Sequence, residues 1–256
     1  MKSYCIDRPI VITMNPQRTI IDQGYVGIQE GKIAYIGDTP CPEETFKDAI
    51  HIDAKGSIVF PGLINTHNHL FQTLTKGVGD DRALDSWLSD MTFPAAAHLD
   101  PVEVYYGALH GCGEGIKSGT TTMFDYMYPH PRESLDDAVI QAFIDTGIRG
   151  VLARGMMDCG EQFGTPTAIM QNVSLVEKEC QRLFELYHNK EHNRISIWVA
   201  PAAIWSNSKN MLRMVWELTN SYKSGLSVHI SETPFDRNAA YQLHGASDAE
   251  VLQQMQ

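Results

Sequence analysis

The hydrophobic positions of the chain follow two different periods, and the change falls near residue 57. Over residues 1–56, apolar and polar side chains alternate in short stretches that are separated by tight turns, and no helical period is visible. The alternation continues on both sides of Glu30-Gly31, which is the pattern of a β-hairpin. We therefore expect residues 1–56 to form a small β-domain.

Residues 57–256 instead alternate short apolar runs with longer segments of helical period. Unbroken apolar runs of this length are typical of strands that are buried on both faces. The expected strands are Ile58–Thr66, Thr120–Tyr126, Arg149–Gly155, Arg194–Ala200 and Gly225–Ser231.

Helix starts and stops are marked between these strands. Capping boxes are expected at Asp100 and at Ser174, and two further helices are expected over Ser134–Thr146 and Ser208–Tyr222. The helix after Asp100 carries a glycine at every fourth position, namely Gly107, Gly111 and Gly115. Because polar and charged residues flank these glycines, we expect close packing of the helix on a sheet rather than a membrane helix.

Alternating strands and helices predict a parallel α/β sheet, either an open doubly wound sheet or a (β/α)8 barrel of the TIM type. No glycine-rich phosphate loop follows the first strand, which ends in histidines instead, and barrels carry their catalytic groups at such strand ends. The barrel is therefore favoured. About five of its eight units fit before residue 256, so we expect the domain at 57–256 to be truncated after its fifth strand, in a protein of roughly 400 residues or more.

The net charge and the cysteine content argue against several classes of function and location. A net charge of −11 without a Lys/Arg run argues against binding to nucleic acid or to an anionic membrane. The five cysteines are scattered and form no C-x-x-C pair, so we expect neither a disulfide framework nor a zinc ribbon, and a reduced, cytoplasmic location. The apolar stretches at the N-terminus are too short for a signal peptide or a membrane span.

Candidate catalytic residues stand at the ends of two expected strands. His67 and His69 are two positions apart, so their imidazoles would lie on the same side, and His229 ends the fifth expected strand. Imidazoles that gather in this way suit a cation such as Zn²⁺. Glu232, three residues after His229, stands where a carboxylate could move a proton. The alternative is that the histidines are structural and that Glu232 is a surface or capping acid.

These motifs resemble a known family. The runs PGLINTHNHLFQTLTKG and SVHISET resemble the amidohydrolase superfamily, in the subgroup that holds guanine and 8-oxoguanine deaminases, adenosine-type deaminases and triazine chlorohydrolases. ALDSWLSDMTFPAAAHL resembles the active-site loop of that subgroup, and SGTTTMFDY, GIRGVLARG and ISIWVAPAAIWSNS resemble its second, third and fourth barrel strands. The N-terminal strands resemble its first half-sandwich.

The resemblance implies a hydrolytic deaminase that acts on an aminated nitrogen heterocycle. His67, His69 and His229 would bind one divalent metal ion, zinc in the first place and iron as the alternative. Metal-bound hydroxide would attack the ring carbon, Glu232 would shuttle the proton, and ammonia would leave. Three further residues would face the small-molecule substrate: Gln72, Trp87 and Arg154. The full-length protein is expected to be a homo-oligomer.

The sequence also departs from the pattern of the family. The further metal-binding aspartate and a further active-site histidine would lie beyond Gln256. Pro201-Ala202 and Ala95 to Ala97 stand where adenosine-type members often have Pro-His and an acid. These alanines would remove the groups that hold a ribose, so a free purine-like or pterin-like base is favoured over a nucleoside.

Three other functions stay open. The same metal site could release chloride from a triazine or open a cyclic amide. Alternatively, the chain could be a truncated, non-enzymatic structural copy of the fold. The H-x-E and P-C-x-x-C motifs of cytidine-type zinc deaminases do not occur in the sequence.

Overall fold

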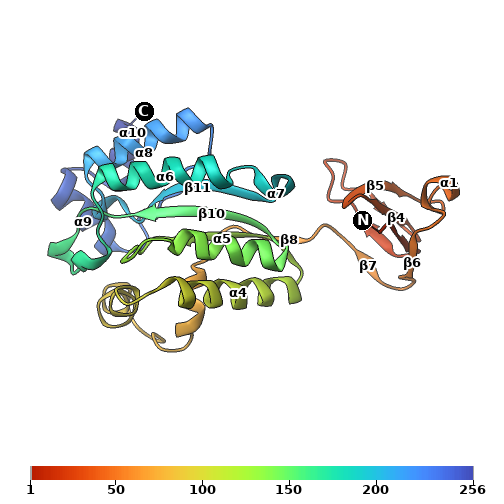
Figure 1. The fold of residues 1–256 in the computed structure, drawn as a ribbon, viewed down its shortest axis with the longest axis horizontal. Helices are drawn as coiled ribbons and strands as arrows, with labels where there is room; N and C mark the ends of the chain where they lie inside the picture. The colour runs from red at the N-terminus through yellow and green to blue at the C-terminus, as the bar shows by residue number, and fades with distance from the viewer. Residues whose placement is uncertain (1, 256) are drawn as a thin grey trace. The chain divides into compact units, whose positions relative to one another are not determined.

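A computed structural model describes residues 2–255 of the protein (Figure 1). The chain forms two compact units, Met1–Gly62 and Leu63–Gln256. The division therefore lies at Gly62, whereas the change of period suggested residue 56. The reason is that β7 (Ile58–Val59) pairs with β2 (Ile10–Ile12) in the first unit.

The first unit contains two small sheets, with strand orders β5-β4-β1-β6 and β3-β2-β7. The expected hairpin joins β4 to β5, and Glu30 and Gly31 have φ angles of 52° and 75°, as a type I′ turn requires. The remaining elements of this unit are short: β1 Tyr4–Asp7, β3 Ile20–Ile21, β4 Tyr25–Gln29, β5 Lys32–Gly37, α1 Glu43–Phe46 and β6 Ile50–Asp53.

A disulfide joins Cys5 in β1 to Cys41, which precedes α1, and their Cα atoms lie 6.7 Å apart. The scattered cysteines led us to expect no disulfide framework and a reduced location, and this pair was not anticipated. Thirty-six positions separate the two residues in the sequence, and only the folded sheet brings β1 beside the loop before α1. Cys112, Cys159 and Cys180 are free, as expected.

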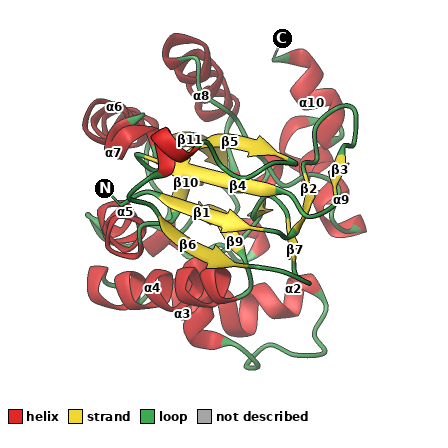
Figure 2. Ribbon diagram, turned by 90° about the vertical axis from the view of Figure 1, so that its right-hand side faces the viewer, coloured by secondary structure: helices red, strands yellow, loops and turns green. Residues whose placement is uncertain are grey.

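The second unit is built on a parallel sheet with the strand order β11-β10-β9-β8. In Figure 2, α4, α5, α6 and α8 follow one another in an arc around β9, β10 and β11, which is the arrangement of strands and helices in an α/β barrel. The strands are β8 Leu63–Asn65, β9 Thr120–Met127, β10 Arg149–Met156 and β11 Ile195–Pro201. The longer helices are α4 Pro101–Lys117, α5 Leu135–Thr146, α6 Val173–Tyr187, α8 Lys209–Tyr222, α9 Pro234–His244 and α10 Asp248–Gln254. The shorter ones are η1 Leu70–Thr75, α2 Leu84–Trp87, η2 Leu88–Thr92, α3 Phe93–Ala96, η3 Glu161–Phe163, η4 Thr167–Ile169, α7 Lys190–Asn193 and η5 Ile204–Ser206.

Two expected strands differ from the structure. The run Ile58–Thr66 is divided at Pro61-Gly62, so that only β8 belongs to the parallel sheet. The run Gly225–Ser231 does not form a continuous strand. It makes two isolated parallel bridges to β11 and the residues that follow it, Leu226 with Val199 and His229 with Ala203. This segment still follows β11, so it brings His229 to the same end of the sheet.

The helix starts agree with the sequence except at α6. Asp100 caps α4 with both hydrogen bonds of a capping box, and Ser208 caps α8. The capping box expected at Ser174 is absent, because Asn172 caps α6 by accepting from the Leu175 N–H. Ser174 donates its hydroxyl to the Asn172 side chain instead. Among residues 2–255, no helix is long and apolar enough to span a bilayer.

The glycines of α4 pack closely on their neighbours, as predicted. A Cβ at Gly111 would lie 2.5 Å from the Leu70 side chain and 3.0 Å from Thr73, both in η1. A Cβ at Gly115 would lie 2.8 Å from Met123 of β9. The absence of side chains therefore lets α4 approach η1, the segment that directly follows His69.

We expect Gly111→Ala to lower the free energy of unfolding by about 1–3 kcal/mol, because the added methyl group overpacks this contact. Gly113→Ala is the matched control on the same helix, since a Cβ there meets nothing within 4 Å. That variant should be more stable by about 0.5–1 kcal/mol, the usual preference for alanine in a helix. Urea unfolding of both variants provides the measurement, and equal effects at the two positions would contradict the packing argument.

Candidate active site

Three imidazoles meet at the carboxyl end of the parallel sheet. His67 and His69 follow β8, and His229 lies in the segment bridged to the chain after β11. The ring centroid of His67 lies 4.9 Å from the ring centroid of His69 and 5.0 Å from that of His229. One ligand atom from each of the three residues lies within 4.8 Å of the others. The fold thus brings together the three histidines that the sequence singled out.

Backbone carbonyl groups orient two of these rings. The Nδ1 atom of His69 lies 2.8 Å from the carbonyl oxygen of Tyr126, and Nδ1 of His229 lies 2.7 Å from that of Ala202. A carbonyl oxygen only accepts, so each Nδ1 carries the proton and donates it. The Nε2 atom of each neutral ring is therefore unprotonated and available as a ligand.

Strand β9 also holds the loop between His67 and Leu70 in place. The Tyr126 N–H donates to the carbonyl of Asn68 at 2.7 Å, and the Leu70 N–H donates to the Asp125 carboxylate at 2.7 Å. Together with the His69–Tyr126 contact, these bonds fix the backbone on both sides of His69.

Burial favours the neutral form of the three imidazoles, of which His67 is the most exposed. It lowers the pKa of His69 to about 3, and it also lowers the pKa of His67 and of His229. If His229 were protonated, its charge would lower the pKa of His67 further. A histidine must be deprotonated to bind a metal ion, so the site favours the form that can act as a ligand.

The spacing of the nitrogen atoms fits a single zinc-type ion. Nε2 of His67 lies 3.3 Å from Nε2 of His229. Two nitrogens bound to one zinc ion at roughly 2.0–2.1 Å in tetrahedral directions would lie about 3.4 Å apart. The three imidazole donors and this one distance are therefore compatible with a zinc-type ion.

The histidines open into a cavity of about 550 Å³, a size typical of small-molecule sites. Glu232 lines the same cavity three residues after His229. Burial and the nearby Asp236 carboxylate raise the pKa of Glu232, while His67 lowers it. Most of the remaining wall is apolar and consists of Leu84, Trp87, Leu88, Phe93, Met157, Ala202, Ala203, Trp205, Val228 and Ile230.

The residues expected to contact substrate have three different locations. Trp87 lines the cavity. Gln72 lies in an adjoining hollow that also borders His67 and His69, and its amide donates to the Tyr128 hydroxyl at 3.1 Å. Arg154 lies elsewhere, and its expected position at the substrate must be corrected.

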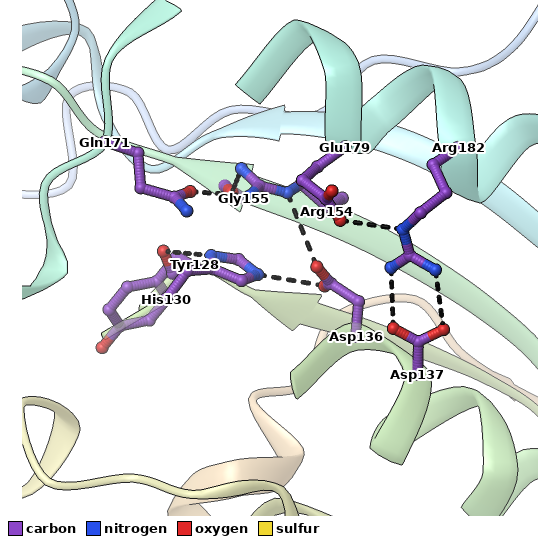
Figure 3. Close-up of polar contacts among 9 residues, drawn as sticks. All are labelled: Tyr128, His130, Asp136, Asp137, Arg154, Gly155, Gln171, Glu179 and Arg182. Carbon is purple, nitrogen blue, oxygen red and sulfur yellow. Dashed lines mark hydrogen bonds and ion pairs between the residues drawn. The ribbon is translucent and has the colours of Figure 1, made fainter. Parts of the chain in front are cut away.

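Arg154 is buried in a polar cluster between β10 and the helices that cover it (Figure 3). Its guanidinium donates to Gln171 at 2.6 Å and to the carbonyl of Gly155, and it lies 3.6 Å from the Asp136 carboxylate of α5. His130 contacts the other oxygen of Asp136 at 3.0 Å. Arg154 points toward the helices because Asp136 offers a buried counter-charge there.

Two tyrosines of the site were not found from the sequence. The Tyr126 hydroxyl donates to the carbonyl of Pro201 at 2.5 Å and lies 3.3 Å from that of Ser227. Tyr128 lines the cavity, with its ring centroid 5.2 Å from that of His69. They are two positions apart at the end of β9, so the rule that points to strand ends could have identified them.

The profile of the Amidohydrolase family matches residues 58–251 of the chain. The chain belongs to this family. Two curated relatives are the 5′-deoxyadenosine deaminase of Methanobrevibacter smithii, which is 38% identical over 94% of this chain and 52% of its own length, and the 5-methylthioadenosine/S-adenosylhomocysteine deaminase of Symbiobacterium thermophilum, which is 33% identical over 91% and 50%. This family member thus spans about half the length of the curated relatives it matches.

Two solved structures share the fold. Atrazine chlorohydrolase from Arthrobacter aurescens, complexed with zinc, has a TM-score of 0.90 at 24% identity and covers 98% of this chain and 58% of its own. Guanine deaminase from C. acetobutylicum, with bound guanine, has a TM-score of 0.86 at 22% identity over 99% and 59%. The α/β class expected from the sequence is confirmed by these likenesses.

The buried Asp125 carboxyl predicts an unusual dependence of stability on pH. Burial raises the pKa of Asp125 to about 7, whereas an unfolded aspartate titrates near 3.9. The folded protein therefore binds this proton more tightly, and its contribution to stability is complete at low pH and is lost as the pH rises through 7. Between pH 5 and pH 8, the unfolding free energy of wild type should therefore fall by roughly 2–3 kcal/mol through this group. Asp125→Asn cannot titrate at this position, so it should not show this loss.

Urea unfolding across this pH range measures the effect. The asparagine keeps an acceptor for the Leu70 N–H, so the variant should fold. Asp81→Asn, at an exposed position, serves as the control and should follow wild type at every pH. Parallel curves for Asp125→Asn and wild type would show that Asp125 does not titrate in this way.

Proposed function

We propose that the protein is a metal-dependent hydrolytic deaminase of an aminated purine or a similar nitrogen heterocycle. The observation that carries the proposal is that three clustered imidazoles and the Glu232 carboxyl line one cavity of ligand size. The names of the curated relatives, which are deaminases of adenosine derivatives, support the same reaction.

His67, His69 and His229 would hold one divalent cation, zinc in the first place and iron as the alternative. When bound, such an ion lowers the pKa of water from 15.7 toward roughly 7 and so supplies a nucleophile at neutral pH. The protein would contribute two ligands, His69 and His229, whose tautomer and direction are set by the carbonyl groups of Tyr126 and Ala202.

Glu232 would transfer protons within the cavity. Its carboxyl group lies on the wall beside the histidines, and its raised pKa brings it closer to neutral pH than an ordinary glutamate. Such a group accepts a proton from attacking water and can donate it to a ring nitrogen or to the departing ammonia. Trp87 and the neighbouring apolar side chains would contact the flat faces of the heterocycle and keep water away from it.

Within this class, we propose a free base as the preferred substrate. A ribose brings hydroxyl groups that need partners when they are buried. Ala202 offers none on the cavity wall, the Ser206 hydroxyl is bonded to Ala203, and Asp236 is occupied by Thr233 and Trp205. The second candidate is a 5′-modified adenosine, which the names of the curated relatives favour.

Two variants should separate metal binding from proton transfer. His229→Ala should lose most of the bound metal and with it the activity, because one of the three imidazole ligands is removed. Glu232→Gln should retain the metal and the fold, while turnover falls about 10²–10⁴-fold, the usual contribution of a general acid–base group. Elemental analysis and ammonia release measure the two effects.

His110→Ala and Glu217→Gln, both exposed on helices, are the matched controls and should behave as wild type. Full metal content in His229→Ala would disprove the metal assignment. Near-normal ammonia release by Glu232→Gln would show that Glu232 is a surface acid.

A panel of aminated purines, pterins and triazines, each purine offered as base and as nucleoside, tests the choice of substrate. We expect the highest kcat/KM for a free base, because the cavity offers few unpaired groups to ribose hydroxyls. A clear preference for 5′-deoxyadenosine or 5-methylthioadenosine would replace the first candidate with the second. Release of chloride from a triazine, with no ammonia released from any compound of the panel, would exclude deamination.

A further inference from the structure

A second group of metal-ligand side chains lies in the first unit, on one face of the sheet β5-β4-β1-β6. Cys5 and Asp7 are two positions apart on β1, so they face the same side, and His51 is the register partner of Cys5 on β6. One ligand atom from each of Cys5, Asp7 and His51 lies within 4.8 Å of the others. Cys41 joins this group through its bond to Cys5.

The two ends of the group differ in their exposure. Cys5 is fully buried and Cys41 nearly so, and both pack beside Phe46. The side chains of Asp7 and His51 are 19% and 56% exposed and meet at 2.8 Å. The sulfur atoms therefore lie in a dry environment, and the imidazole borders solvent, where an ion could enter.

The disulfide conceals the ligand capacity of the sulfur atoms. A sulfur atom in a disulfide is a poor ligand, whereas a thiolate binds zinc-type ions strongly. Opening the Cys5–Cys41 bond would release the Cys5 sulfur beside one imidazole and one carboxylate, and the Cys41 sulfur next to Cys5. Four donors of these kinds complete a tetrahedral zinc site.

We propose that the thiol form of the protein binds one zinc-type divalent cation through Cys5, Cys41, Asp7 and His51, and that the disulfide is the metal-free form of the same site. Two molecules of a low-molecular-weight thiol together supply two electrons and two protons to the disulfide and are oxidised to one disulfide between them. Each cysteine thiol then loses its proton when it binds the cation. The loop before α1 is linked to β1 in both forms, by sulfur in one and by the metal ion in the other.

This proposal is independent of the catalytic function and can be tested with cobalt(II) as the probe. The protein is reduced, freed of metal and titrated with Co²⁺, and the thiolate-to-cobalt charge-transfer absorption is recorded. The site of His67, His69 and His229 has no sulfur ligand among the described residues, so it does not contribute to this band. We expect the reduced protein to develop this band, complete by two equivalents of Co²⁺ because the three histidines can take the other ion, and the oxidised protein to show no such band.

His51→Ala should weaken cobalt binding about tenfold or more, as should Cys41→Ser. His51 is exposed, so its replacement should leave the fold intact, which circular dichroism verifies. Cys159→Ser and His110→Ala are the controls and should titrate as wild type. The proposal is overturned if the reduced wild type gives no thiolate band, or if either His51→Ala or Cys41→Ser leaves the titration unchanged.

Discussion

The candidate active site depends on hydrogen bonds between imidazole Nδ1 atoms and backbone carbonyl groups at the ends of strands. The carbonyl groups of Tyr126 and Ala202 accept hydrogen bonds from Nδ1 of His69 and of His229, respectively. This tautomer leaves Nε2 of both rings without a proton and free to act as a ligand. An imidazole that carried its proton on Nε2 could not bind a metal ion through that atom. The parallel sheet therefore determines the chemistry of the site as well as its position.

The sequence predicted the elements that follow local rules. Asp100 and Ser208 cap helices because their side chains reach the first free N–H groups, and a tight turn at Glu30-Gly31 requires positive φ. The three histidines could be anticipated because strand ends collect on one side of a parallel sheet. Each of these predictions needs only a few neighbouring residues or a single topological rule.

The differences arise where partners distant in the sequence decide the outcome. Arg154 stands near the end of a strand, as a substrate contact would, but the buried Asp136 of α5 draws its guanidinium to the other side. Cys5 and Cys41 meet because β1 and the loop before α1 are neighbours in space. The segment 225–231 has the composition of a strand, yet it makes only two isolated bridges. Such outcomes follow from tertiary contacts that no local pattern records.

The cavity wall and the histidines are supported by separate parts of the chain. Leu84, Trp87, Leu88 and Phe93 contribute to the wall from short helices outside the sheet, whereas the ring directions depend on the ends of β9 and β11. Substitutions in the segment 84–93 can therefore alter the shape of the cavity without disturbing the ligand geometry. This separation allows a lineage to acquire new substrates by drift in one segment outside the sheet while the reaction itself is inherited unchanged.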